Sequence, residues 1–173
     1  MLRDFNLLVT TARGSEEDAC SEIWYLLGEI GDEAANVDKT GVKGLVVAKS
    51  ALNPFEVIEK LREMLKHHPS EFRYLLRIIP IDKVVRTDIE EIKSTAAEMA
   101  SKIMAEDTFR VTVEKRFSDI PSNEIIREVA AKVERKVDLN NPKKIFLIEV
   151  VGGLTGMSVV NPADILSVGR ERM

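Results

Sequence analysis

The chain has 173 residues, of which 45% are hydrophobic and 31% charged, a composition typical of globular rather than disordered proteins. Its formal net charge of −4 argues against unspecific coating of nucleic acid, although a local basic patch is compatible with it. The only cysteine, Cys20, excludes an internal disulfide and a cysteine metal cluster. No apolar run approaches the roughly 20 residues of a membrane span and the N-terminus has no signal-peptide pattern, so we expect a cytoplasmic protein without membrane contact.

The first part of the chain alternates between strand and helix patterns. Ser15 is expected to cap the first helix, and Asn53 followed by Pro54 is a typical start for the second. The order β-α-β-β-α-β predicts a ferredoxin-like sandwich as a first domain over residues 1–79. Its expected elements are strand 5–11, helix 15–30, strands 33–38 and 42–49, helix 53–68 and strand 72–79.

The remaining residues, 80–173, predict a second domain of α-(α)-β-α-β-β order, so the fold class is α+β, an α/β sandwich. The almost continuous apolar run Ile145–Val151 is typical of a central strand that is buried on both faces. The other expected elements are a helical turn near Asp82–Arg86, a helix capped by Thr87 or Asp88, strand Phe109–Arg116, a helix from Ser122 or Asn123 to Val137, and strand Thr155–Val160.

Strand Phe109–Arg116 is the centre of the functional hypothesis. Apolar residues alternate with polar ones along it, which predicts a half-buried strand, and it ends on two cations, Lys115 and Arg116. A loop and a helix N-terminus follow, and such a terminus with nearby cations is suited to anions. The alternative is a core strand with ordinary solvated charges. Residues 110–144 hold nine basic and six acidic residues, whereas 1–75 hold nine and thirteen, so an anionic partner is expected at the second domain.

Three segments, in their order and spacing, resemble the THUMP domain: Phe109–Arg116, Val137–Pro142 and Thr155–Val159. THUMP domains are RNA-binding modules of tRNA-modifying proteins. Segments Ile78–Val85 and Pro162–Val168 are similar to a narrower group, the stand-alone THUMP proteins that assist tRNA cytidine N4-acetylation. The resemblance covers the whole chain, because members of that group carry an N-terminal ferredoxin-like domain.

The resemblance implies an adaptor that binds tRNA and presents it to a separate acetyltransferase. We expect no active site, no metal, no cofactor and no DNA partner, because no catalytic constellation is visible and one cysteine cannot complete a deaminase zinc site. Two alternatives stay open. One is a protein–protein scaffold that uses the acidic N-terminal half without contacting RNA, and the other is an RNA-binding module for another tRNA modification.

The candidate RNA-binding residues are cations, together with groups beside a helix start and a glycine-containing loop. Arginine suits phosphate because its planar guanidinium bonds two oxygens at once. For each cation the alternative is a solvated charge or a local ion pair. The predicted set is Arg86, Arg110, Lys115, Arg116, Ser122, Asn123, Lys143, Lys144 and Ser158.

Overall fold

The computed structural model describes residues 1–172 and divides the chain into two compact units. Unit 1 contains Met1–Ile81 and the C-terminal segment from Ala163 onward, and unit 2 contains Asp82–Pro162. Each unit is built on one five-stranded sheet, so the predicted α+β class is confirmed. Within residues 1–172, no helix is both long enough and apolar enough to cross a membrane.

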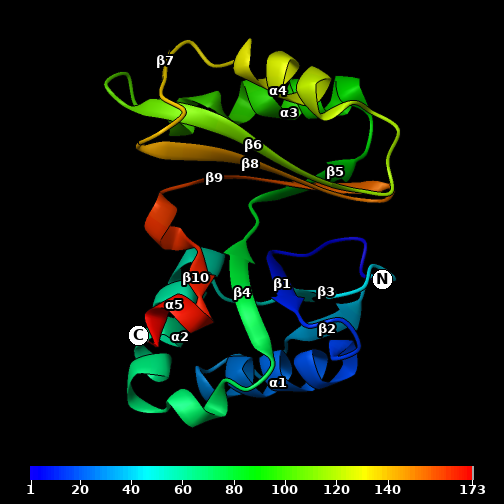
Figure 1. The fold of residues 1–173 in the computed structure, drawn as a ribbon, viewed down its shortest axis with the longest axis vertical. Coiled ribbons are helices and arrows are strands. Elements are labelled where there is room, and N and C mark those ends of the chain that lie inside the picture. Colours follow the sequence, from blue (N-terminus) through cyan, green and yellow to red (C-terminus); the bar gives the residue numbers. More distant parts are fainter. Residues whose placement is uncertain (173) are drawn as a thin grey trace. The chain divides into compact units, whose positions relative to one another are not determined.

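Unit 1 has the predicted order β-α-β-β-α-β, to which the C-terminal segment adds one strand. Its sheet has the strand order β10-β4-β1-β3-β2, and α1 and α2 cover one face of it (Figure 1). Apolar residues of both helices pack on that face to form the core. The elements are β1 (Leu7–Thr11), α1 (Glu16–Glu29), β2 (Asn36–Lys39), β3 (Leu45–Lys49), α2 (Pro54–His67), the 3-10 turn η1 (Pro69–Glu71) and β4 (Leu75–Pro80).

Local side-chain chemistry explains where the two helices of unit 1 begin. Asn53 caps α2 as predicted, because its Oδ1 accepts hydrogen bonds from the N–H groups of Phe55 and Glu56 at 2.8 and 3.3 Å. Ser15 stands at the N-cap of α1, but its side chain makes no capping bond. The Glu16 carboxylate instead accepts from the N–H groups of Gly14 and Gly44, at 2.8 and 3.0 Å.

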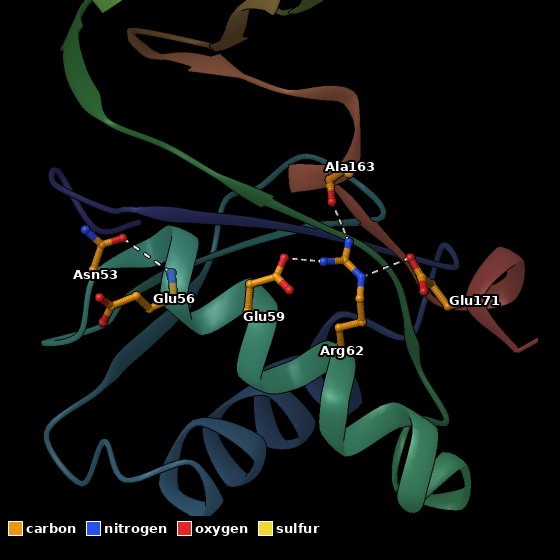
Figure 2. A network of polar contacts seen from close by, with 6 residues as sticks. All are labelled: Asn53, Glu56, Glu59, Arg62, Ala163 and Glu171. Atoms are coloured by element: carbon orange, nitrogen blue, oxygen red, sulfur yellow. Dashed lines mark hydrogen bonds and ion pairs between the residues drawn. The ribbon is translucent and has the colours of Figure 1, made fainter.

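The C-terminal segment belongs to unit 1, which differs from the predicted division at residues 79 and 80. Its strand β10 (Leu166–Ser167) extends the sheet by pairing antiparallel with β4, and Leu166 is fully buried in the core of unit 1. Arg62 of α2 also holds this segment, because it donates to the carbonyl of Ala163 and forms ion pairs with Glu59 and Glu171 (Figure 2). The 3-10 turn η3 (Pro162–Asp164) begins at the last residue of unit 2 and enters this segment, which also contains α5 (Val168–Glu171).

Unit 2 has a sheet of order β5-β9-β8-β6-β7, with α3 and α4 on one face (Figure 1). The run predicted as a central strand is β8, which lies between β9 and a parallel β6, so this prediction is confirmed. The elements are β5 (Lys83–Arg86), α3 (Ile89–Met99), the 3-10 turn η2 (Ala100–Lys102), β6 (Thr108–Arg116), α4 (Ser122–Ala130), β7 (Lys136–Val137), β8 (Lys144–Val151) and β9 (Leu154–Val160).

Two element predictions for unit 2 are wrong. The segment predicted as a helical turn near Asp82–Arg86 is the edge strand β5, since its central residues are β-branched valines and it finds a partner in β9. The helix predicted to reach Val137 ends at Ala130, and Lys136–Val137 pairs with β6 as the short strand β7.

The caps of α3 and α4 also test the predictions. Asp88, not Thr87, caps α3 by accepting from the N–H groups of Glu90 and Glu91. Neither Ser122 nor Asn123 caps α4: both lie in its first turn, and the N-cap position is taken by Pro121, which has no side-chain acceptor.

Candidate nucleic-acid interface

The register of β6 and β8 divides the predicted cations between the two ends of the unit 2 sheet. Because the strands are parallel, Phe109 pairs with Lys144 at one end and Arg116 with Val151 at the other. Seven residues separate the two positions, which corresponds to about 23 Å along a strand. The cations therefore form two separate groups rather than the single group that their nearness in sequence suggests.

The first group, here the β6-end cluster, consists of Arg86, Lys115 and Arg116. Arg86 pairs with Leu154, Leu154 with Val151, and Val151 with Arg116, so both arginines lie in one row across four strands. With adjacent strands about 4.8 Å apart, the two backbones are about 14 Å apart.

The arginines of the β6-end cluster are already paired with acids. Arg116 Nη1 lies 2.9 Å from Oε2 of Glu149, whose side chain is only 3% exposed. Arg86 Nε lies 2.5 Å from Oε2 of Glu91, and this carboxylate raises the pKa of the Arg86 guanidinium. Exposed Lys115 differs, because its Nζ donates to the carbonyl oxygen of Ile120 at 3.0 Å. Much of the charge of this cluster is thus neutralised within the fold.

The second group, here the β8-start cluster, consists of Arg110, Lys136, Lys143 and Lys144. Lys136 pairs with Thr108, Lys144 with Phe109, and Arg110 with Ile145, so three strands bring these residues to one end of the sheet. Within residues 1–172, none of the four takes part in an ion pair; the pairs of unit 2 use Arg86, Lys93, Lys102 and Arg116.

The contacts of the β8-start cluster are with neutral oxygens. Arg110 Nη1 donates to the carbonyl of Leu139 at 2.9 Å, while its buried Nε has no hydrogen-bond partner among the described residues. Lys144 Nζ donates to Oδ1 of Asn161 at 2.9 Å. Lys136 and Lys143 have exposed side chains. Cations that keep their full charge at the surface are the groups that attract phosphate.

Ser158 is not part of either group, and its predicted role in RNA binding is corrected by the structure. The strand predicted over Thr155–Val160 is β9 (Leu154–Val160), so Gly156–Ser158 is not an accessible loop: its backbone pairs with β5 on one side and with β8 on the other. The Ser158 side chain is fully buried, opposite Leu147 of β8. Its hydroxyl therefore cannot reach a ligand at the surface.

Residues 86–160, which include every predicted RNA-binding residue, match the family model for the THUMP domain. We call residues 86–160 the THUMP domain below, after the family model that they match. It is 27% identical over 169 residues to THUMP domain-containing protein 1 of Homo sapiens, an alignment that covers 86% of this chain and 47% of the relative. The chain thus spans about half the length of the curated relatives it matches.

Solved structures share the fold at low sequence identity. The protein PH1313 of Pyrococcus horikoshii Ot3 matches with a TM-score of 0.67 and 18% identity, over 95% of this chain and 55% of that protein. A 4-thiouridine synthetase in complex with RNA and ATP matches with a TM-score of 0.53 and 19% identity, over 91% of this chain and 42% of the synthetase. At these identities, the likenesses show the fold.

Two residues of the THUMP domain were not predicted as site residues. Lys136 was assigned to a helix, although its position just before the segment Val137–Pro142 is a signal that could have found it. Phe117 follows the basic end of β6, and its side chain is 78% exposed. Phe117 has the same parity as Phe109, Val111 and Val113, but exposed Lys115 ends the alternation before it, and its φ angle is positive.

A second kind of surface lies outside the THUMP domain, on the outer side of α1. Trp24 and Tyr25 are 58% and 41% exposed there. Residues 16–35 contain seven acidic and no basic side chains. Hollows flank the two aromatic rings, one beside Cys20 and Val37 and one beside Gly28, Glu29 and Glu33. We call Trp24, Tyr25, Glu29 and Glu33 the α1 surface; its charge is opposite to that of the β8-start cluster.

Proposed function

We propose that this chain binds tRNA through its THUMP domain, with the β8-start cluster as the principal phosphate contact. THUMP domain proteins bind RNA and act in tRNA modification, and one structural neighbour is a synthetase in complex with RNA. The observation that carries the proposal is that Arg110, Lys136, Lys143 and Lys144 gather from three strands without an acidic partner among residues 1–172.

The physical reason is the release of counterions from the RNA backbone. Each phosphate that a lysine or arginine neutralises frees condensed cations, so binding weakens as salt rises, with a slope of about 0.7 to 0.9 per contact. A cation that is already paired with an acid of the protein gains less free energy from binding a phosphate, because it must first give up that partner. The unpaired β8-start cluster is therefore better suited to phosphate than the two arginines of the β6-end cluster.

Lys115 and the start of α4 form a second, smaller contact in this proposal. The first turn of α4 contains Ser122 and Asn123 and has no side-chain cap, so its N–H groups and the helix dipole favour an anion. Lys115, whose hydrogen-bond acceptor is the neutral carbonyl of Ile120, lies in the preceding strand.

Binding should be measured by filter retention or gel shift with bulk tRNA at several salt concentrations. The expected result is binding that weakens linearly on a logarithmic salt scale. A chain that retains no tRNA even at low salt would contradict the proposal.

We further propose that the chain acts as an adaptor, presenting tRNA to a separate acetyltransferase for N4-acetylcytidine formation, and that it has no active site of its own. The similarity of Ile78–Val85 and Pro162–Val168 to the group that assists cytidine acetylation supports this proposal. A binding module can raise the rate of a reaction by holding the substrate in position for another enzyme.

The adaptor role is tested by reconstitution with a tRNA transcript, acetyl-CoA and ATP, with and without the acetyltransferase. We expect no product from this chain alone and a faster reaction when it is added to the acetyltransferase. Formation of N4-acetylcytidine by this chain alone would make it an enzyme. If the acetyltransferase is not stimulated, only the tRNA-binding proposal remains.

A second candidate function, a protein–protein scaffold, is favoured by the α1 surface. Exposed aromatic rings flanked by hollows and acids are complementary to a basic protein segment, whose arginines can stack on Trp24 and pair with Glu29 or Glu33. RNA would be repelled by the same acids. This function does not exclude tRNA binding, because the two surfaces use different residues.

Trp24 is the only tryptophan of the chain, so its fluorescence reports directly on the α1 surface. Titration with an amidated peptide of alternating arginine and leucine should change this fluorescence saturably, and the same peptide with glutamate should not. Glu29→Lys with Glu33→Lys should weaken peptide binding. The matched control is Glu56→Lys with Glu63→Lys on α2, where both acids are exposed. If the control pair weakens peptide binding equally, the effect comes from the overall charge of the protein and not from the α1 surface.

A further inference from the structure

Phe117 is a strongly exposed aromatic residue that directly follows β6. Its side chain is 78% exposed, more than any other large hydrophobic residue described, so its ring contributes little to burial. Its φ angle is +57°, and among residues 1–172 it is the only residue other than glycine with a positive φ. The left-handed region is unfavourable for a bulky side chain, and glycine would adopt it freely.

The loop that presents Phe117 is held at both ends. The carbonyl oxygen of Arg116 accepts a hydrogen bond from the Gly152 N–H at 2.8 Å, which joins the end of β6 to the turn between β8 and β9. On the other side of the loop, Lys115 Nζ donates to the carbonyl of Ile120 at 3.0 Å. The ring is therefore presented to solvent from a constrained backbone, and such preorganisation reduces the entropy cost of binding.

The surroundings indicate what this ring can bind. Lys115 is an exposed cation two residues before it, and the first turn of α4, free of a side-chain cap, begins five residues after it. A ligand that suits all three features has a flat π face and a negative charge. An unpaired nucleotide of RNA has both, and aromatic residues beside cations are a common platform for stacking single-stranded bases.

We infer that Phe117 is a stacking platform for an unpaired base of the bound RNA. The inference rests on the proposed function, because it assumes that the THUMP domain binds RNA. Single-stranded nucleotides would then bind beside the β6-end cluster, whereas the β8-start cluster contacts phosphates of paired and unpaired nucleotides alike. Base stacking gives a function to an exposed aromatic ring at a backbone position that favours glycine.

The test compares two fluorescently labelled RNAs of roughly ten nucleotides, one single-stranded and one a blunt duplex. Phe117→Gly removes the ring and relieves the backbone conformation. We expect it to lower the affinity for the single strand roughly 5- to 150-fold and to leave the duplex affinity unchanged, while the melting temperature stays equal or rises. Met104→Ala is the matched control, because Met104 is also a strongly exposed apolar residue of this domain, at 55%, and belongs to neither cluster; it should change neither affinity.

A spectroscopic readout separates stacking from a general loss of structure. Phe117→Trp in a Trp24→Phe background places the only indole at this position. We expect it to retain the single-strand affinity and its fluorescence to be quenched when the single strand binds.

Three outcomes would overturn the inference, and they differ from one another. If Phe117→Gly leaves single-strand affinity unchanged while Lys143→Glu with Lys144→Glu lowers it, stacking fails but RNA binding stands. If the unaltered chain binds neither RNA, the proposed function fails as well. If Phe117→Gly impairs only the stimulation of an acetyltransferase, the ring contacts protein rather than RNA.

Discussion

The two ends of the THUMP sheet both carry cations, but these cations differ in what they already contact. At the β6-end cluster, Arg86 and Arg116 are paired with Glu91 and Glu149. At the β8-start cluster, Arg110 and Lys144 contact neutral oxygens and no acid among residues 1–172. A basic residue in a candidate motif can therefore belong to the fold or to an interface, and its acidic partners decide which.

The largest effect is expected from Arg116→Ala, which would leave the buried Glu149 carboxylate without its guanidinium partner. Removing one partner of a buried ion pair typically costs about 3–5 kcal/mol of folding free energy. Thermal and urea unfolding should therefore show a marked loss of stability.

Lys115→Ala is the control for Arg116→Ala, since it removes the adjacent, exposed cation. It should change the unfolding free energy by no more than about 0.5 kcal/mol. If both variants lose the same amount, the Arg116–Glu149 pair is not what distinguishes the two positions.

A second prediction concerns an acid that already has hydrogen-bond partners within the fold, Asp32 of unit 1. Its Oδ2 accepts from Ser50 Oγ at 2.5 Å and from the Ala51 N–H at 2.9 Å, and Oδ1 accepts from the Ala34 N–H at 3.0 Å. Burial opposes ionisation, but these hydrogen bonds outweigh it and lower the pKa of the Asp32 carboxyl. We expect Asp32→Asn to cost about 1–3 kcal/mol at neutral pH.

The pH dependence of this loss follows from the lowered pKa. The stabilisation by ionised Asp32 is fully present above the unfolded-state pKa, about 3.9, and is lost as pH falls through the lower folded-state pKa. Unfolding measured from pH 7 down to pH 2 should therefore show the parent and Asp32→Asn converging in acid. A difference that stays constant over this range would contradict the assignment.

A third prediction concerns the unpaired cations. Lys143→Glu with Lys144→Glu should weaken tRNA binding roughly tenfold or more and flatten its salt dependence by about 0.7 to 0.9 for each phosphate that the variant no longer neutralises. Stability should change little, because Lys143 is exposed and half-buried Lys144 loses one hydrogen bond, to Asn161. Gel shifts at several salt concentrations and thermal unfolding measure the two effects. Unchanged binding would shift the RNA interface away from the β8-start cluster.

The smallest effect is expected at the α1 surface. Glu29→Lys with Glu33→Lys reverses two acids outside the THUMP domain and should leave tRNA affinity within about twofold at 0.1 M salt, because neither acid belongs to the proposed phosphate contacts. The same gel shifts test this. A large gain in affinity would instead show that the acids of unit 1 lie close enough to the RNA to repel it.

Much of each element could be predicted from sequence, because the signals are local. The alternation in Phe109–Arg116 reflects a strand with one buried face, and the apolar run of β8 reflects a strand that is buried on both faces. The caps Asn53 and Asp88 bond N–H groups two and three residues away. The same local reasoning failed at β5 and β7, because these short strands exist only through pairing with β9 and β6.

The order of the main elements and the residue types available for an anion site follow from the amino-acid sequence. Which cations lie close together depends on contacts between distant segments. The register of β6 and β8 separates Lys143 and Lys144 from Lys115 and Arg116, the pairing of β9 buries Ser158, and the Glu149 side chain neutralises Arg116. The physical reason is that strand register and ion pairing are interactions between segments far apart in the chain, whereas helix caps and alternation are interactions between near neighbours.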